Sequence, residues 1–216
     1  MLIGLYGGTF DPVHCGHVHA AECVRKFLGL DVIRMVLNAQ PVHKSSEQAM
    51  TAHRWSMLRA VCANRQGLIA DDVEVRRGGR SFTVDTLSLL QSEFPQAVLC
   101  WIVGEDSFAT LTSWRRWENL LDHCNLVVIP RPGQNIGFSE QIKALCRKHE
   151  TAYFDATRNG QIVRANLPMR AVSSTEIRQR IALGQSIADL VEADVEQYIR
   201  RNKLYEDNIS AREKSF

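Results

Sequence analysis

The sequence predicts an α/β fold in which a doubly wound parallel sheet carries a small helical appendage at its C-terminal end. Short apolar runs of strand length alternate with longer segments of helical spacing, as in parallel sheets that are covered on both faces. The last third, from about residue 173, shows two helical segments with no strand between them. A chain of 216 residues can bury one proper core, and we expect a single domain over 1–205 followed by a polar tail at 206–216.

The expected elements follow one another along the chain. Strands are predicted at the apolar runs 1–6, 32–37, 68–75, 98–103, 125–129 and 151–154. Helices are predicted where apolar residues recur every three or four positions, around 20–28 and 55–62 and over 84–94, 114–122, 139–149, 173–183 and 189–202. Sheets of this kind bind ligands beyond the carboxyl ends of their strands, so the turns after the strands are the candidate site.

Composition limits the classes of function. Hydrophobic residues make up 45% and charged residues 23%, as in ordinary globular proteins, and a net charge of +2 falls short of a nucleic-acid-binding surface. No apolar stretch approaches the roughly 20 residues that span a bilayer, and the N-terminus lacks the basic region of a signal peptide. The six cysteines form no C-x-x-C pair. We therefore expect a cytoplasmic protein with free thiols and without nucleic-acid or membrane partners.

A glycine pair follows the first predicted strand, where an α/β fold turns into its first helix. Gly7 and Gly8 permit a backbone path with positive φ and let main-chain N–H groups approach a ligand. The dipeptide Asp11-Pro12 then suits the N-cap and the first position of a helix. From such a helix His14 and His17 would project on one face and donate hydrogen bonds to phosphate oxygens.

Two simpler interpretations of this segment stay open from the residues alone. A glycine pair after a strand is commonly a plain turn, and neither the P-loop nor the G-x-G-x-x-G fingerprint is present. Histidines and a cysteine also suggest a metal site. However, His14, His17 and His19 do not share one helical face, and Cys15 points away from the first two. We expect no protein-bound metal.

A second candidate phosphate site opens a later helix. Ser173 and Glu176 fit an S-x-x-E capping box, which alone is a structural feature. The hydroxyls of Ser174 and Thr175 add donors to the positive end of that helix, and Arg178 lies above the same face. Alone, this segment is compatible with a helix cap or with a phosphate site.

Together the two segments resemble a known family. The run GGTFDPVHCGH at 7–17 resembles the G-x-F-D-P-x-H-x-G-H signature of the (T/H)xGH nucleotidyltransferase superfamily, in the form found in nicotinate-nucleotide adenylyltransferases. The run VSSTEIR at 172–178 resembles the I-S-S-T-x-I-R motif that completes the ATP site. The resemblance covers nearly the whole chain except its tail, and it implies a Rossmann-like fold.

The resemblance implies adenylyl transfer from ATP to nicotinate mononucleotide, with Mg²⁺ accompanying ATP, in NAD biosynthesis. The acceptor phosphate attacks the α-phosphorus in line and no covalent enzyme intermediate forms, so the protein supplies positioning and charge neutralisation. The positive donors implied by the resemblance are His14, His17, Lys44 and Arg178. The ATP-binding residues that it implies are Gly7, Gly8, Thr9, Phe10, His17, Gly104, Asp106, Arg131, Ser173, Ser174, Thr175 and Arg178.

Further segments resemble the family's acceptor site. The run SFTVDTL at 81–87 resembles S-Y-T-x-D-T-L, whose backbone amides receive the nicotinate carboxylate, although Phe82 replaces the tyrosine and its hydroxyl. The run GEDS at 104–107 resembles a G-x-D segment near the ribose, and RPG at 131–133 an R-R-P-G-like turn that borders the adenine. In all, the resemblance assigns five residues to the acceptor site: Lys44, Phe82, Thr83, Asp106 and Trp114.

Two of these assignments depend entirely on the resemblance. Lys44 ends a run at 38–44 that looks like P-x-x-x-P-P-H-K, with Val42 where a second proline is often seen; by itself it would be a solvated loop lysine. Trp114 looks like the tryptophan that stacks on the pyridine ring. By spacing alone, Trp114 and Trp117 would be core-facing helix residues.

The alternatives are relatives of the same superfamily and one non-enzyme. A nicotinamide-mononucleotide enzyme is the nearest, and the segment 81–87 favours the acid form over it. The glycine pair, His14 and that segment disfavour pantetheine-phosphate adenylyltransferases and cytidylyltransferases. A non-catalytic nucleotide-binding regulator would not need His14, His17 and Arg178 together.

Overall fold

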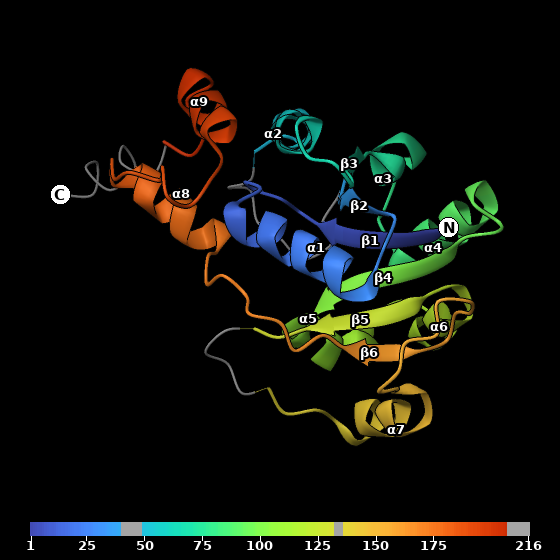
Figure 1. Cartoon of the computed structure of the whole chain (residues 1–216). Coiled ribbons are helices and arrows are strands. Elements are labelled where there is room, and N and C mark those ends of the chain that lie inside the picture. The colour runs from blue at the N-terminus through green and yellow to red at the C-terminus, as the bar shows by residue number, and fades with distance from the viewer. Residues whose placement is uncertain (40–48, 132–135, 207–216) are drawn as a thin grey trace.

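The computed structural model describes residues 1–39, 49–131 and 136–206. Within them, parallel strands form one sheet in the order β3-β2-β1-β4-β5-β6, the order of doubly wound folds (Figure 1). The strands are β1 Leu2–Gly8, β2 Val32–Leu37, β3 Leu68–Asp71, β4 Val98–Gly104, β5 Asn125–Ile129 and β6 Ile162–Arg164. The predicted doubly wound parallel sheet is confirmed.

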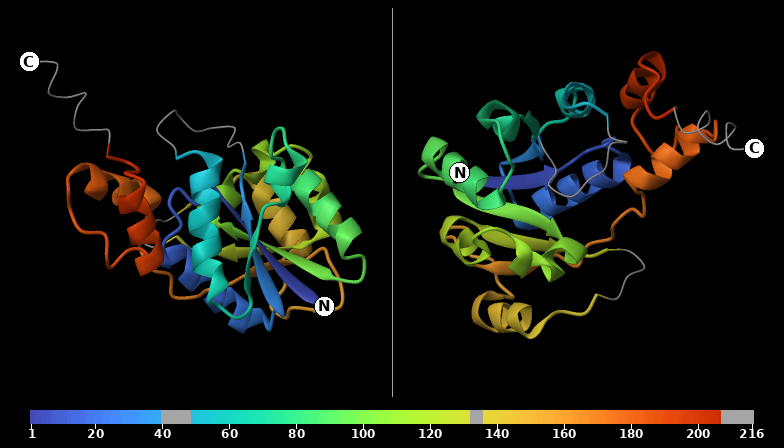
Figure 2. Two further views of the ribbon diagram at one scale, coloured as in Figure 1. Left: turned by 90° about the horizontal axis from the view of Figure 1, so that it is seen from above. Right: turned by 180° about the vertical axis from the view of Figure 1, so that it is seen from behind.

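Helices cover both faces of the sheet (Figure 2), and each face has its own buried apolar cluster. One face is covered by α1 Cys15–Leu28 and α2 Thr51–Ala63, and α8 Ser174–Ala182 and α9 Ala193–Arg201 extend the same buried cluster beyond the strand ends. The other is covered by α3 Val73–Arg77, α4 Thr83–Glu93, α5 Glu105–Ala109, α6 Leu120–His123 and α7 Glu140–His149. None of the described helices is long and apolar enough to cross a membrane.

The strand order reverses at β1, which pairs with β2 on one side and with β4 on the other. The crevice beyond the carboxyl ends of two such strands is the usual ligand position in this architecture. Figure 1 shows the helical appendage, α8 and α9, on the side to which the strand arrows point. The appendage therefore lies at the functional edge of the sheet.

The third predicted strand is too long, because its second half is helical. β3 ends at Asp71, whose Oδ1 accepts a hydrogen bond from the Val73 amide at 2.9 Å, and α3 follows directly. Val73 is buried whereas Val75 is 37% exposed, so the apolar run does not continue on one sheet face. Short apolar runs fit a strand and a buried helix equally well, which explains the error.

The helix predicted over 114–122 is also wrong. The segment consists of two 3₁₀ turns, η1 Leu111–Ser113 and η2 Trp117–Asn119, followed by the short helix α6. Arg116 adopts a left-handed conformation with φ 50°, which interrupts helical hydrogen bonding between them. The three-residue spacing of the tryptophans therefore arises from successive turns.

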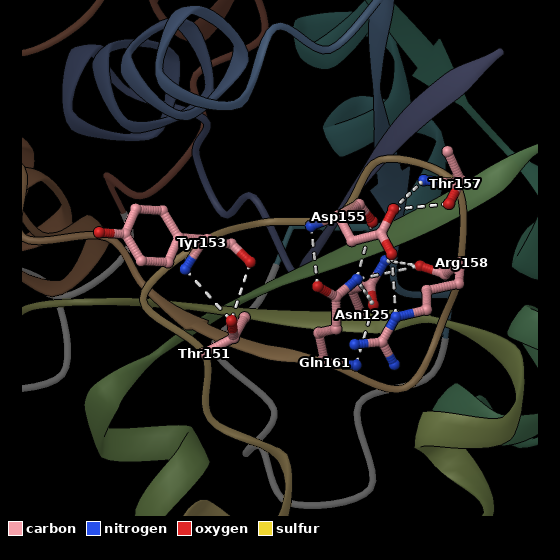
Figure 3. Close-up of polar contacts among 7 residues, drawn as sticks. All are labelled: Asn125, Thr151, Tyr153, Asp155, Thr157, Arg158 and Gln161. Carbon is pink, nitrogen blue, oxygen red and sulfur yellow. Dashed lines mark hydrogen bonds and ion pairs between the residues drawn. The ribbon is translucent and has the colours of Figure 1, made fainter.

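The last predicted strand is misplaced, since 151–154 forms a turn and β6 follows it later. Side-chain amides hold the intervening loop (Figure 3): Asn125 Oδ1 accepts from the backbone N of Gln161 at 2.9 Å and from its Nε2 at 3.2 Å. Gln161 Nε2 also donates to the carbonyl of Asp155 at 2.8 Å. Thr151 Oγ1 accepts from the Tyr153 amide at 3.1 Å within the turn. Such side-chain bonding is invisible to a hydropathy pattern.

Candidate active site

A cavity of about 860 Å³ lies at the carboxyl ends of the strands, within the range of small-molecule sites. It gathers segments that are far apart in the sequence, from the end of β1 to the start of α8. Most of the predicted site residues line this cavity: Gly7, Gly8, Thr9, Phe10, His14, His17, Phe82, Thr83, Gly104, Asp106, Trp114, Arg131, Ser173, Ser174 and Thr175. The predictions for Lys44, Val42, Pro132 and Gly133 lie outside the described residues.

The glycine pair ends β1 and does not use positive φ, so that part of the prediction is wrong. A Cβ on Gly7 would lie 2.6 Å from Cζ2 of Trp101, and one on Gly8 would lie 2.7 Å from Cε1 of Phe10. Both glycines are thus required for close packing of the cavity floor. The left-handed residue of this loop is Phe10, with φ 49°.

Helix α1 begins later than predicted, with His14 as its N-cap in place of Asp11. The His17 amide donates to Nδ1 of His14, and the His14 amide donates to Nδ1 of His17, each at 3.3 Å. The two rings stack with centroids 3.6 Å apart. Because both Nδ1 atoms accept, a neutral ring carries its hydrogen on Nε2. The reciprocal cap therefore fixes both imidazoles as Nε2–H donors.

Burial, together with the nearby Arg131 guanidinium, lowers the pKa of His14 to about 4. His14 is therefore neutral at pH 7 before substrate binds, and the positive charge implied for it is absent in that state. Its neutral ring still donates through Nε2. Bound phosphates would favour the charged form and raise this pKa.

The stability of the protein should depend on His14 at mildly acidic pH. The unfolded chain protonates this imidazole near pH 6.5, whereas the native protein does so only near pH 4. Between these values the unfolded state binds more protons, so the free energy of unfolding falls as the pH falls. The contribution of His14 between pH 7.5 and 5 is about 2 kcal/mol. Urea unfolding of wild type and His14→Asn, which keeps a cap acceptor, measures it; equal losses in both proteins would contradict it.

The second phosphate motif begins α8 as predicted, with Ser173 as N-cap: its Oγ accepts from the Glu176 amide at 3.1 Å. The reciprocal half of the capping box is not formed, since the Glu176 carboxylate accepts from Arg180 at 2.8 Å. The remaining side chains reach the first motif. Ser174 Oγ donates to the carbonyl of Pro12 at 3.0 Å, and Arg178 Nη1 donates to that of Asp11 at 2.7 Å.

These bonds connect the two motifs directly and change the position expected of Arg178. Its guanidinium contacts the first phosphate loop at the Asp11 carbonyl and is not part of the described cavity lining. The contact of Arg178 with phosphate stays a prediction. Ser173 and Thr175 do line the cavity, at the positive end of α8.

The acceptor segment opens α4, whose N-cap is Phe82. The Phe82 side chain packs under the guanidinium of Arg115, which lies 4.7 Å from the ring centroid. Trp114, at the end of η1, and Arg115 both line the cavity. An aromatic face and a cation thus lie beside the first amides of a helix, a combination that suits an anionic aromatic ligand.

A buried acid behind this segment was missed by the sequence analysis. Glu74 lines the cavity and is 5% exposed, and its Oε1 accepts from Thr86 Oγ1 at 2.8 Å. Thr86 in turn accepts from Arg77 Nη1 at 3.0 Å. Burial raises the pKa of Glu74. Its place just after a strand end was the available signal, but the apolar run 68–75 concealed it.

Buried Arg54 was also missed. It is 2% exposed and donates to the carbonyls of Thr9 and Asn38, both at 2.8 Å. It donates as well to the carbonyls of Ala39 at 3.3 Å and Ala49 at 3.2 Å. Arg54 therefore ties the first phosphate loop to the chain on both sides of residues 40–48. An arginine inside a helical pattern gives no sequence signal for such a role.

Asp106 and Arg131 form an ion pair across the cavity rim at 3.1 Å. Asp106 Oδ1 is buried and has no hydrogen-bond partner within the described residues. It is therefore available to a ligand hydroxyl, as the G-x-D resemblance implies. Gly104 leaves the room that this carboxylate occupies, because a Cβ there would overlap Oδ1.

Comparison with known proteins agrees with the two motifs. Residues 5–180 match the model of the cytidylyltransferase-like family. A relative from Aeromonas salmonicida, named "Probable nicotinate-nucleotide adenylyltransferase", is 40% identical over 208 residues, which are 94% of this chain and 97% of the relative. The chain belongs to the nicotinate-nucleotide adenylyltransferase family. Another member, from Pseudoalteromonas atlantica, is 36% identical over 94% of each chain. The resemblance drawn from the motifs is confirmed.

Solved structures share the fold of this family member. Plasmodium falciparum nicotinic acid mononucleotide adenylyltransferase complexed with NaAD superimposes with a TM-score of 0.75 at 21% identity, covering 96% of this chain and 98% of that one. The same enzyme complexed with APC gives a TM-score of 0.73 at 20% identity, with the same coverage. At these identities the likeness shows the Rossmann-like fold alone.

Proposed function

We propose that this protein transfers the adenylyl group of ATP to nicotinate mononucleotide, giving nicotinate adenine dinucleotide and pyrophosphate for NAD biosynthesis. The observation that carries the proposal is a single cavity lined by both phosphate motifs and by the acceptor segment. Membership of the nicotinate-nucleotide adenylyltransferase family supports it. All six cysteines are free thiols, which supports a cytoplasmic location.

The reaction needs little covalent chemistry from the protein. An oxygen of the acceptor phosphate forms a bond to the α-phosphorus, and the bond from that phosphorus to the β-bridging oxygen breaks. The acceptor phosphate is already ionised at neutral pH, so no general base is required. His14 and His17 donate through Nε2 to oxygens whose charge grows in the transition state, and the amides at the start of α8 hold the triphosphate.

Mg²⁺ is the cation expected with ATP, and the residues present fit it. Mg²⁺ is usually bound by one or two carboxylates together with substrate phosphates. Asp106 is the cavity-lining carboxylate that would hold the ion, and its Oδ1, which has no protein partner within the described residues, has lone pairs enough to accept a ligand hydroxyl as well. The ion would neutralise the triphosphate, and Lys44 and Arg178 are the further cations that we propose for the phosphates.

The acceptor site favours an acid over an amide. The first amides of α4 are positive partners for the nicotinate carboxylate, and Arg115 adds a charge beside Phe82. Neither contact requires the hydroxyl that Phe82 lacks. Trp114 supplies the face on which the pyridine ring stacks.

Replacing Trp114 by alanine should raise the KM for nicotinate mononucleotide about tenfold or more, because stacking on an aromatic side chain contributes about 1–3 kcal/mol per base. The KM for ATP should stay within about twofold. Trp117→Ala is the matched control, since Trp117 is also half-buried but does not line the described cavity. Steady-state kinetics with each substrate varied separates the two; equal effects of both variants would remove Trp114 from the acceptor site.

Pyrophosphate release tests the proposed function. The enzyme is supplied with ATP and Mg²⁺ and, in separate reactions, with nicotinate mononucleotide, nicotinamide mononucleotide or phosphopantetheine; CTP with a phosphorylated acceptor is a further arm. We expect the highest kcat/KM with the acid nucleotide. Faster turnover of the amide would assign the nicotinamide enzyme instead. If no reaction releases pyrophosphate, the enzyme proposal is wrong and the alternative is a non-catalytic nucleotide-binding regulator.

A further inference from the structure

The Asp11 end of the first phosphate loop is held from behind by the C-terminal appendage. Arg178 and Ser174, both on α8, donate to the carbonyls of Asp11 and Pro12. A third donor comes from beyond α9: the hydroxyl of Tyr205 donates to Oδ1 of Asp11 at 2.7 Å. Asp11 is 2% exposed and does not line the described cavity, so these bonds act on the loop and not on a ligand.

The appendage also holds the start of the helix that carries His17. The Cys15 amide, the first of α1, donates to the carbonyl of Leu190 at 3.0 Å, in the connection between α8 and α9. Figure 1 shows α8 beside this end of α1. The loop is therefore fixed at Asp11 and again at Cys15, on the two sides of His14.

Tyr205 is itself fixed in an unusual backbone conformation. Its φ is 68°, in the left-handed region, where an L-residue with a bulky side chain costs about 1–2 kcal/mol. Such residues persist where the surroundings determine them, and they cluster at functional sites. The Tyr205 ring packs against the buried cluster that includes α1 and α2. Ring and hydroxyl together fix the chain after α9 against the loop.

Among the described residues, the buried carboxylate of Asp11 has few hydrogen-bond donors besides the Tyr205 hydroxyl. Oδ1 accepts from Tyr205 and also from the Ala49 amide at 3.3 Å, whereas the buried Oδ2 has no hydrogen-bond partner within the described residues. Burial raises the pKa of Tyr205 above its usual value, with the Asp11 charge adding to the shift. The hydroxyl therefore stays protonated and donates to the carboxylate, a charge-assisted bond of the stronger kind.

We propose that Tyr205 is a positioning residue for adenylyl transfer, whose hydroxyl holds Asp11 and thereby sets the place of His14 and His17. The inference rests on the proposed function. It adds a C-terminal residue outside both phosphate motifs to the residues that control the reaction. Small displacements of catalytic donors lower kcat strongly without a comparable loss of ground-state binding.

The test compares Tyr205→Phe, which keeps the ring, with Tyr198→Phe, a matched control. The Tyr198 hydroxyl bonds to Nδ1 of His53 at 3.1 Å, on the same appendage but away from the loop. For Tyr205→Phe we expect kcat to fall about tenfold, with the KM for ATP within about twofold. Tyr198→Phe should keep kcat within about twofold. Melting temperatures measured in parallel show whether the two variants are equally folded.

A double-mutant cycle tests whether Tyr205 acts on kcat through its hydrogen bond to Asp11. In an Asp11→Ala background, Tyr205→Phe should change kcat by less than about twofold, because its partner is already gone. If the wild type is active and Tyr205→Phe has the same kcat, the inference is overturned while the proposed function stands. Equal losses of kcat in the Tyr205 and Tyr198 variants would make the contact merely structural and overturn it too. A wild type that releases no pyrophosphate removes the proposed function and the inference together.

Discussion

Replacing His17 by asparagine should lower kcat by about 10²–10³-fold, the usual cost of removing one donor to a transition-state oxygen. Asparagine keeps an acceptor near the position of Nδ1, so it can still receive the His14 amide and preserve the reciprocal cap. It lacks the Nε2–H that this cap fixes. The melting temperature should therefore change little, and the KM for ATP should change far less than kcat.

His17→Gln is the matched variant, because its amide nitrogen reaches the position of Nε2 while the cap acceptor is lost. We expect it to keep more activity than His17→Asn and to be less stable. Stopped-assay kcat values and melting temperatures for both variants give the comparison. Near-normal turnover of His17→Asn would show that His17 acts only as part of the helix cap.

Gly7→Ala should reduce kcat/KM by about a hundredfold, since a displacement of about 1 Å at a reacting centre has effects of that size. The added Cβ would lie 2.6 Å from the indole of Trp101, so the end of β1 or the indole must shift. Overpacking of this kind also costs about 1–3 kcal/mol of stability. Steady-state kinetics and urea unfolding measure the two effects.

Two further variants make the Gly7 prediction specific. Gly137→Ala is the control, because a Cβ at Gly137 meets no heavy atom within 4 Å; it should leave both quantities unchanged. Adding Trp101→Leu to Gly7→Ala should restore part of the lost activity by removing the clash. If the double variant loses the sum of the two single effects, the indole contact is not the cause.

The sheet and the cavity were predictable because their signals are local in the sequence. Each strand is a short apolar run, and β2 and β5 have the predicted bounds. The turns after strands of a parallel sheet meet at one edge, which brings Gly8 of β1 and Gly104 of β4 into the same cavity. The resemblance then indicated the chemistry of that edge through motifs about 160 residues apart.

The rest of the site depends on tertiary contacts that no local pattern carries. His14 became the N-cap of α1 because its ring and that of His17 satisfy each other's amides, while the carboxylate of Asp11 is engaged by Tyr205. Arg54 sits within a helical pattern that conceals its four carbonyl contacts. Such polar contacts form only when the elements are assembled.

The configuration at the α-phosphorus shows directly whether the acceptor phosphate attacks ATP in one step, which is the reaction that every residue placed at the site serves. The enzyme is given one diastereomer of ATP with sulfur at the α-phosphorus, together with nicotinate mononucleotide, and the configuration of the dinucleotide product is determined by phosphorus NMR. A single in-line displacement predicts inversion. Retention would contradict it, since it requires two displacements and an adenylylated enzyme.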